Sequence, residues 1–291
     1  MARIAVLGSA NMDLVAYVPV APGRGETVTG REFRTIPGGK GANQAIAAAR
    51  AGAAVSFVGA VGSDAFGEQI RATLLAEGID VGRLRTVPGP TGTAHIVVDD
   101  EGGNSIVVVP SANARVIALS DADRSMIAAA DALLLQLETP LEGVLAGART
   151  ARAAGVPVIL TPAPVRPLPA ELLAAVDLLV PNEHEAASLA DGLAGLLELV
   201  GEAVITLGSA GSRYGRRGEE PIRIPAPEVT AVDTTAAGDT FVGALAVARA
   251  EGRPTEAALR WATAAAAFSV QRAGASTSMP TRAEIDAAFR A

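Results

Sequence analysis

Short apolar runs alternate with helical, alanine-rich segments along most of this chain. Strands of a parallel sheet have this appearance because helices cover both faces of the sheet. The pattern therefore predicts an α/β fold of three layers, α/β/α, with a mostly parallel central sheet. The runs interpreted as its strands are residues 4–7, 55–61, 133–135, 156–160, 178–180 and 203–207.

A second pattern predicts a small separate sheet. Residues 93–98 and 105–109 alternate in polarity around the turn sequence Asp-Asp-Glu-Gly-Gly, which is typical of a β-hairpin. Residues 14–33 form short extended pieces that prolines and glycines interrupt. We expect these pieces to pair as a lid-like sheet inserted at about 13–36 and 92–110 of a single domain that spans residues 1–291.

Composition excludes several classes of function. The sequence has no cysteine, which excludes disulfides and thiolate metal sites, and its only histidines are His95 and His184. The formal charge of −7 argues against nucleic-acid binding, which needs a basic surface. No signal peptide and no uninterrupted apolar run of membrane-spanning length are found, so we expect a cytoplasmic protein without a membrane partner.

The segment Asp233–Phe241, with the sequence DTTAAGDTF, combines a turn of small residues with the start of an amphipathic helix. Free N–H groups at such a start suit negative charge on a phosphate. Asp239 lies there, where its ionised carboxylate is stabilised and available as a base. The alternative is that Asp239 only caps the helix, and because a cap can also be a base, both interpretations stay open.

The segment Pro37–Gln44, with the sequence PGGKGANQ, offers flexible backbone and two donors, Lys40 and Asn43. It is not a P-loop, because no glycine stands five residues before Gly39, and Gly41 rather than Ser or Thr follows Lys40. The alternative is a flexible loop that leads into a helix capped by Asn43.

Polar residues follow several of the predicted strands directly. Ligands of open α/β sheets bind beyond the carboxyl ends of the strands, so these residues predict a shared cleft. A dinucleotide-dependent dehydrogenase is disfavoured, because the sequence after the first strand is GSAN rather than Gly-x-Gly-x-x-Gly. The polar positions are Asn11, Asp13, Glu138, Asn182, Glu185 and the segment Ile205–Gly211.

The sequences GGKGANQ at 38–44 and DTTAAGDTF at 233–241 resemble the two signatures of the ribokinase-like (PfkB) family of carbohydrate kinases. The resemblance extends over nearly the whole chain, and two long motifs in the correct order are highly specific. It implies transfer of the ATP γ-phosphate to a sugar hydroxyl, dependence on Mg²⁺ and activation by K⁺. It also implies a homodimer formed through the small sheet.

The resemblance assigns a role to each matching residue. Asp239 would be the catalytic base, with the Gly238 N–H in the anion hole. The sugar site would comprise Asn11, Asp13, Gly39, Lys40, Gly41, Ala42, Asn43, Glu138 and Asp239. The nucleotide site would comprise Asn182, Thr206, Leu207, Gly208, Ser209, Ala210, Gly211, Gly238, Asp239 and Thr263. The K⁺ site would comprise Asp233, Thr235, Ser269, Arg272, Gly274 and Ser278, while Glu185 would organise Mg²⁺ through water.

The arrangement Asn11-Met12-Asp13, with Glu138 in the sequence QLETP, resembles the family members that phosphorylate the 5-hydroxyl of D-ribose. Deoxyribose, fructose, a 2-keto-3-deoxy sugar acid or a nucleoside are alternative substrates. A non-catalytic sugar sensor is a further alternative. Thr263 stands where the family commonly has Asn or His, and the connection 182–206 is shorter than usual, so the preference for adenine stays open.

Overall fold

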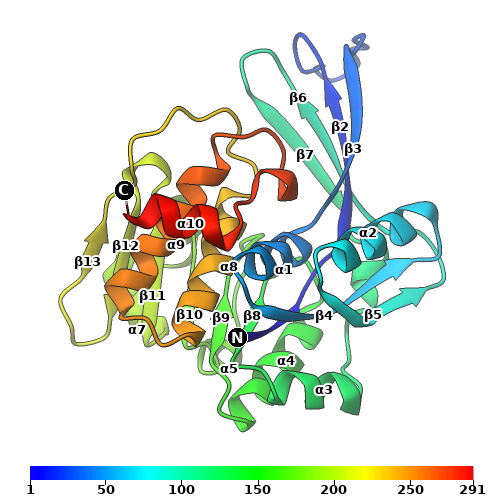
Figure 1. Cartoon of the computed structure of the whole chain (residues 1–291). Helices are drawn as coiled ribbons and strands as arrows, with labels where there is room; N and C mark the ends of the chain where they lie inside the picture. The colour runs from blue at the N-terminus through cyan, green and yellow to red at the C-terminus, as the bar shows by residue number, and fades with distance from the viewer. Residues whose placement is uncertain (291) are drawn as a thin grey trace.

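The computed structural model describes residues 1–290, and a nine-stranded sheet forms its centre (Figure 1). The strand order is β13-β12-β11-β10-β9-β8-β1-β4-β5, and every neighbouring pair from β11 to β5 is parallel. Only β12 and β13 run antiparallel to their neighbours, so the prediction of a mostly parallel sheet is confirmed. The strands are β1 (Arg3–Leu7), β4 (Ala54–Gly62), β5 (Asp80–Val87), β8 (Ala132–Leu135), β9 (Val158–Leu160), β10 (Leu178–Leu179), β11 (Glu202–Thr206), β12 (Ser212–Arg216) and β13 (Ile222–Ile224).

Helices cover both faces of this sheet and enclose two hydrophobic cores. Alternate side chains of a strand point to opposite faces, so Ile4 and Val6 enter one core while Ala5 and Leu7 enter the other. The first core is covered by α1 (Lys40–Arg50), α2 (Ala65–Ala76), α8 (Ala237–Ala250), α9 (Thr255–Ser269) and α10 (Arg282–Arg290). The second is covered by α3 (Asp121–Ala128), α4 (Leu141–Ala153), α5 (Ala170–Leu173), α6 (Glu183–Leu189) and α7 (Gly192–Leu199).

This arrangement confirms the predicted three layers. None of the helices within residues 1–290 has the length and apolar character needed to cross a membrane. Three short 3₁₀ turns complete the described chain, namely η1 (Ser111–Arg115), η2 (Gly208–Ala210) and η3 (Ser276–Ser278).

A second sheet of four strands, called the small sheet below, projects from this body at the upper right of Figure 1. Its order is β3-β2-β6-β7, with β2 and β6 parallel and the outer pairs antiparallel. The pairing of β6 with β7 is the predicted hairpin. The strands are β2 (Asn11–Tyr17), β3 (Glu32–Gly38), β6 (Gly92–Val98) and β7 (Asn104–Val109).

Helix α1 begins earlier than the sequence predicted. We expected Asn43 to cap it, whereas Gly39 is the N-cap and Asn43 lies in the first turn. Gly39 has a φ of 91°, and a Cβ at this position would lie 2.8 Å from the Asn11 nitrogen. The chain leaving β3 therefore turns against the start of β2, and the helix starts at once, with the Ala42 N–H donating to the Ser9 carbonyl over 2.9 Å.

Candidate active site

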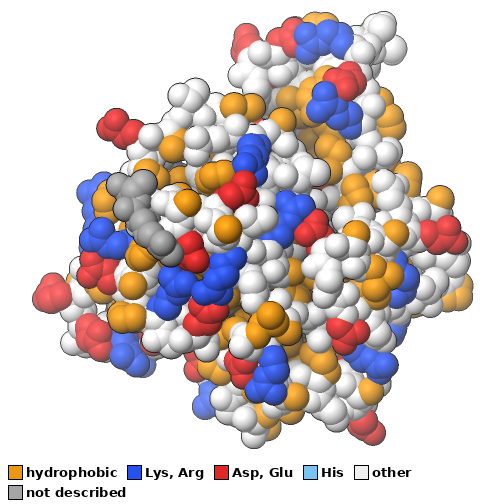
Figure 2. Space-filling view, viewed as in Figure 1, with side chains coloured by type: hydrophobic (Ala, Val, Ile, Leu, Met, Phe, Trp, Pro, Cys, Tyr) orange, Lys and Arg blue, Asp and Glu red, His pale blue; other side chains and the backbone are white. Residues whose placement is uncertain are grey.

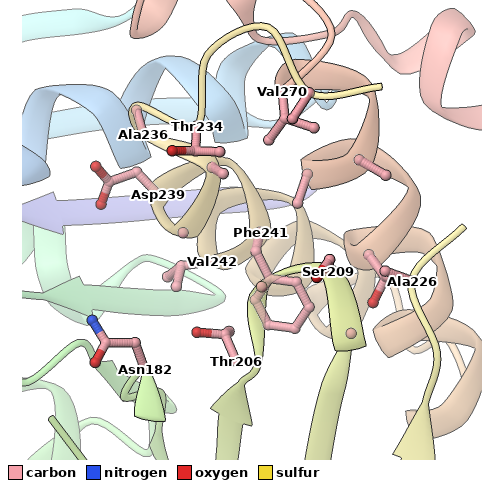
Figure 3. Close-up of a pocket in the computed structure, with 18 of the residues that line it drawn as sticks. Asn182, Thr206, Ser209, Ala226, Thr234, Ala236, Asp239, Phe241, Val242 and Val270 are labelled. Atoms are coloured by element: carbon pink, nitrogen blue, oxygen red, sulfur yellow. The ribbon is translucent and has the colours of Figure 1, made fainter. Parts of the chain in front are cut away.

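A cavity of about 820 Å³ lies at the carboxyl ends of the central strands. Figure 3 shows Asn182 and Thr206, which follow β10 and end β11, on one side of it, and Asp239 and Ala236 on another. Leu207 and Ala210 do not line it, which differs from the prediction. The predicted nucleotide residues that do line it are Asn182, Thr206, Gly208, Ser209, Gly211, Gly238, Asp239 and Thr263.

The start of α8 forms one wall of the cavity. Its N-cap is Ala236, which has a left-handed φ of 58° and offers no side-chain cap. Such a conformation is costly for a residue with a Cβ and is retained mainly where function requires it. The N–H groups of the first turn lack partners within the helix, and Ala237 and Gly238 line the cavity. The Ala237 N–H donates to the Thr234 carbonyl over 3.3 Å, so the free donors and the positive dipole end at Gly238 are the part of the turn that would suit an anion.

Asp239 is not the cap of this helix, so the interpretation of the residue as an N-cap is wrong. Its side chain is buried in the first turn, with 7 % of its surface exposed. Oδ1 accepts from Gln44 Nε2 over 3.0 Å and Oδ2 accepts from Asn43 Nδ2 over 3.3 Å. Burial raises the pKa of Asp239, while Lys40 and the two amide donors act against burial. The carboxylate is thus held by side chains of α1, which lies beside α8.

Four carboxyl groups interact electrostatically with the ammonium group of Lys40. Three of them form a cluster with it, namely Asp13 on β2, Glu138 after β8 and Asp239 on α8, and the fourth is Glu185 on α6. Glu138 Oε2 accepts from Ser9 Oγ over 2.5 Å and from the Lys40 N–H over 3.1 Å. Burial would lower the pKa of Lys40, but these carboxylates raise it, so the ammonium form is stable. The cluster brings together residues that are far apart in the sequence.

Asp13 is a second carboxyl group of this cluster with a raised pKa. Burial raises its pKa to about 7, and the charges of Glu138 and Asp239 act in the same direction, while Lys40 opposes them. Near neutral pH this carboxyl group is therefore both donor and acceptor, which suits contact with a hydroxyl group.

The remaining predicted sugar residues lie next to this cluster. Asn11 opens β2 and pairs with Gly38, which places it beside the start of α1. Asn43 Oδ1 is buried and has no hydrogen-bond partner within residues 1–290. It is an acceptor without a partner beside Asp239, as a ligand site requires. The residues that complete this part of the site are Gly39, Gly41 and Ala42, and all three are buried.

The predicted Mg²⁺ residue, Glu185, forms a capping box at the start of α6. Its Oε2 accepts from the Asn182 N–H over 2.9 Å, and its own N–H donates to Asn182 Oδ1 over 2.8 Å. No group of three or more acidic or histidine side chains within residues 1–290 could hold a metal directly. Glu185 lines the cavity, and a single carboxylate there would suit an ion held through water rather than one coordinated directly, so its role toward Mg²⁺ stays a prediction.

The predicted K⁺ residues come from two segments that Asp233 joins. Its Oδ1 accepts from the Thr235 N–H over 2.9 Å, and its Oδ2 accepts from the Gly274 N–H over 2.8 Å. The hydroxyls of Ser269 and Ser278 donate to the carbonyls of Ala266 and Ala275. Asp233 thus joins the two predicted segments through backbone N–H groups, and the role of this junction toward K⁺ stays a prediction. The Arg272 side chain instead pairs with Glu284 and so offers only its carbonyl.

Thr263 lines the cavity without offering its hydroxyl proton to a ligand. Its Oγ1 donates to the Leu259 carbonyl one turn earlier in α9, over 2.9 Å. The neighbouring wall is apolar and comprises Pro227, Val229, Ala266, Ala267 and Val270. These side chains therefore offer an adenine ring apolar contact and few hydrogen bonds, and the preference for adenine stays open.

Sequence reasoning missed several polar residues that support the site. Ser9 and Gln136 each follow a strand at its carboxyl end, which was an available signal. Gln44 ends the motif GGKGANQ at 38–44, but the sequence alone did not indicate what its side chain does. Asn113 gave no signal, because its contact with Asn11 joins residues 102 positions apart. The residues missed are Ser9, Gln44, Asn113, Gln136 and Thr161.

A family model, described as pfkB family carbohydrate kinase, matches residues 1–282. The chain belongs to the pfkB family of carbohydrate kinases. It is 45% identical to the ribokinase of Bacillus subtilis over 98% of this chain and 99% of the relative. It is 40% identical to the ribokinase of Schizosaccharomyces pombe over 99% of this chain and 98% of the relative. The structure of Arabidopsis thaliana ribokinase complexed with ribose and ATP superposes with a TM-score of 0.93, at 37% identity and full coverage of both chains.

Proposed function

We propose that this carbohydrate kinase transfers the γ-phosphate of ATP to the 5-hydroxyl of D-ribose. The observation that carries the proposal is the position of Asp239, which lines the cavity and also belongs to the charged cluster around Lys40. A sugar held by the cluster would meet a nucleotide held in the cavity at this carboxylate. Ribokinases are 45% and 40% identical to this chain over nearly its full length, and one of known structure binds ribose and ATP, which supports the choice of substrates.

The reaction assigns one task to each wall of the site. The Asp239 carboxylate takes the proton of the 5-hydroxyl as the bond between that oxygen and the γ-phosphorus forms. The bond between the γ-phosphorus and the bridging oxygen breaks, which gives ribose 5-phosphate and ADP. The first-turn N–H groups of α8, among them that of Gly238, stabilise the charge on the transferred group. Lys40 contributes a fixed positive charge next to Asp239.

The charge of the cluster favours a neutral sugar. Asp13, Glu138 and Asp239 face the single cation Lys40, so a carboxylate on the substrate would meet like charge. This argues against a 2-keto-3-deoxy sugar acid. Ribose and deoxyribose differ by one hydroxyl, and a site whose polar groups bind that hydroxyl discriminates strongly against the sugar without it. Asn11, Asn43 and Asp13 are the groups proposed to bind the ring hydroxyls.

Two ions belong to the proposal. Mg²⁺ neutralises phosphate charge when it is bound, and Glu185 together with Asn182 would hold it through water. K⁺ would be held by Asp233 and the backbone carbonyls of Thr235, Ser269, Arg272, Gly274 and Ser278. Bound K⁺ would activate the enzyme by fixing the turn before Gly238. Asp233 already ties that turn to Gly274 through its hydrogen bonds.

A homodimer through the small sheet is also proposed. Ile106, Val107, Val108 and Val109 of β7 are all exposed, with Val107 at 64 %. Figure 2 shows hydrophobic side chains on the surface over this projecting sheet. An apolar edge strand of this kind is typical of an interface. A change of Val107→Glu should lower the mass measured by light scattering, and an unchanged mass would remove this part of the proposal. The cytoplasmic location stays a prediction.

The experiment that tests the function is a panel of sugars with ATP and Mg²⁺, with ADP formation as the readout. We expect ribose to give the highest kcat/KM, with deoxyribose, fructose, a 2-keto-3-deoxy sugar acid and adenosine well below it. Faster turnover of another sugar would reassign the substrate. Binding of ribose without turnover of any sugar would favour a sensor instead of an enzyme.

A further inference from the structure

Two buried glutamines connect Asp239 to the interior of the protein. Gln44 Nε2 donates to Asp239 Oδ1 over 3.0 Å and to Thr161 Oγ1 over 3.1 Å. Gln44 Oε1 accepts from Gln136 Nε2 over 2.6 Å. Both glutamine side chains are fully buried, and neither lines the cavity. They therefore act on Asp239 from behind, without contact to a substrate.

The three contacts of Gln44 fix the direction of its amide. Its NH₂ group faces Asp239 and Thr161, and its carbonyl oxygen faces Gln136. A rotation of the amide by half a turn would direct the carbonyl oxygen at the carboxylate of Asp239. The donation from Gln136 opposes this rotation, because the rotated amide would meet Gln136 with NH₂ against NH₂.

The Gln136 amide points its NH₂ group at Gln44, and in this orientation its own carbonyl oxygen lacks a hydrogen-bond partner in the described chain. Its Oε1 is buried and has no partner within residues 1–290. A buried acceptor without a partner is unfavourable, so its retention needs a reason. A Cβ on Gly8 would lie 2.0 Å from this oxygen, so only a glycine at the end of β1 leaves room for the side chain. The Gly8 backbone thus leaves the space that the Gln136 side chain occupies.

We propose that Gln136 and Gln44 are positioning residues that keep Asp239 in one orientation as a hydrogen-bond acceptor, ready to take the sugar proton. The inference rests on the proposed function, in which Asp239 is the base. Gln136 fixes the Gln44 amide, and Gln44 fixes one carboxylate oxygen and stabilises the ionised form. The other oxygen, Oδ2, has only the longer contact of 3.3 Å with Asn43 and is the one left to react.

Charged groups also influence Asp239 from every neighbouring element. Lys40 on α1 favours its ionised form, whereas Glu138 after β8 and Asp13 on β2 oppose it. Glu185 on α6 acts on Lys40. Burial raises the pKa of Asp239, and the hydrogen bond from Gln44 lowers it. Replacing Gln136 leaves all these charges in place. A change in the pKa of Asp239 would therefore report only the loss of the fixed Gln44 amide.

The test compares wild type with Gln136→Met, which keeps the length of the side chain but removes its donor. Loss of the fixed Gln44 donor raises the pKa of Asp239, so the acid limb of kcat should move to higher pH. We expect kcat to fall about tenfold at the acid end of the profile, with both KM values within about twofold. Gln44→Met and the double variant should show equal losses, since Gln136 acts only through Gln44.

A control separates positioning from stability. Asp123→Ala removes a buried capping box at the start of α3, on the opposite face of the sheet. It should lower the melting temperature without moving the pH profile. If Gln136→Met lowers the melting temperature and likewise leaves the pH profile unmoved, its role is structural and the inference is wrong.

A second readout does not depend on turnover. Asp239 is observed by NMR with ¹³C in the aspartate carboxyl groups, and its signal is assigned by its absence in Asp239→Asn. In Gln136→Met this signal should titrate at higher pH than in wild type. An unmoved titration overturns the inference even if the enzyme is active. A moved titration in a protein that phosphorylates no sugar would show that the two glutamines orient Asp239, and it would remove the proposed function instead.

Discussion

Asn113 Nδ2 donates a hydrogen bond to Asn11 Oδ1 over 2.7 Å, so a residue of η1 fixes the direction of an amide at the start of the small sheet. The Asn113 side chain is itself held at both ends by Ala10, whose N–H donates to its Oδ1 and whose carbonyl accepts from its Nδ2. The NH₂ group of Asn11 is therefore the end that remains for a ligand. In the proposed sugar site this residue would donate to a hydroxyl oxygen.

A change of Asn113→Asp tests this relationship. The new carboxylate can only accept from Asn11, so the Asn11 amide should turn and present its oxygen to the sugar. We expect the KM for ribose to rise about tenfold or more, with the KM for ATP nearly unchanged. Steady-state kinetics with each substrate varied in turn would measure both constants. An equal rise in the two values would place Asn11 outside the sugar site.

Asp239→Asn tests the base. The variant keeps an acceptor for Gln44 but cannot take a proton, so kcat should fall by roughly 10²–10⁴. Because burial raises the pKa of Asp239, the fold gains little from its charge, and the free energy of unfolding should stay within about 1 kcal/mol of wild type. Chemical denaturation and turnover are measured on the same preparation. A clear loss of stability with intact turnover would show that Asp239 has only a structural role.

The layers of the fold and the two motifs were predictable because both are local signals. Buried strands appear as apolar runs, and the hairpin β6–β7 appears as alternation around a turn. The start of α1 was wrong by a few residues, because the position of Gly39 against Asn11 decides it. That contact is tertiary and leaves no mark in the local pattern.

The role of Asp239 was likewise only half visible in the sequence. An aspartate before an apolar run suggests a cap, and the sequence does not show that Ala236 adopts the left-handed conformation instead. The pairing of Gln44 with Gln136 could not be predicted, since their contact joins residues 92 positions apart on α1 and after β8. Residues that support a site through other side chains are found only when the packing is known.

Asp13→Asn should remove a pH dependence of stability. In the unfolded chain the pKa of this carboxyl is about 4, whereas in the fold it is about 7. A raised pKa gives stability that is complete below the unfolded value and is lost as the pH rises through the folded value. Relative to Asp13→Asn, the unliganded wild type should therefore lose up to roughly 4 kcal/mol between about pH 4 and pH 7, which is about 1.4 kcal/mol for each of about three pKa units. Denaturation at several pH values checks this, and a constant difference between the two proteins would contradict it.

Replacing Asp233 tests the proposed K⁺ site. Asp233 accepts from the N–H groups of both Thr235 and Gly274, so it joins the turn before α8 to the segment that follows α9. A cation at this junction would hold the Gly238 N–H in place for the phosphate without contact to it, which is preorganisation. A loose shell of carbonyl oxygens suits a large ion, so K⁺ should activate more than Na⁺ or Li⁺.

The decisive comparison is kcat in K⁺ against kcat in tetramethylammonium at the same ionic strength, for wild type and for Asp233→Ala. We expect K⁺ to raise kcat of wild type and to have little effect on the variant. Asp191→Ala serves as a control, because Asp191 is an exposed residue between α6 and α7 whose side chain makes no capping hydrogen bond to α7. A wild type without K⁺ dependence would show that the site is absent. Full activation of Asp233→Ala by K⁺ would show that the ion binds elsewhere. Asp233 would then only hold the turn before α8 against Gly274.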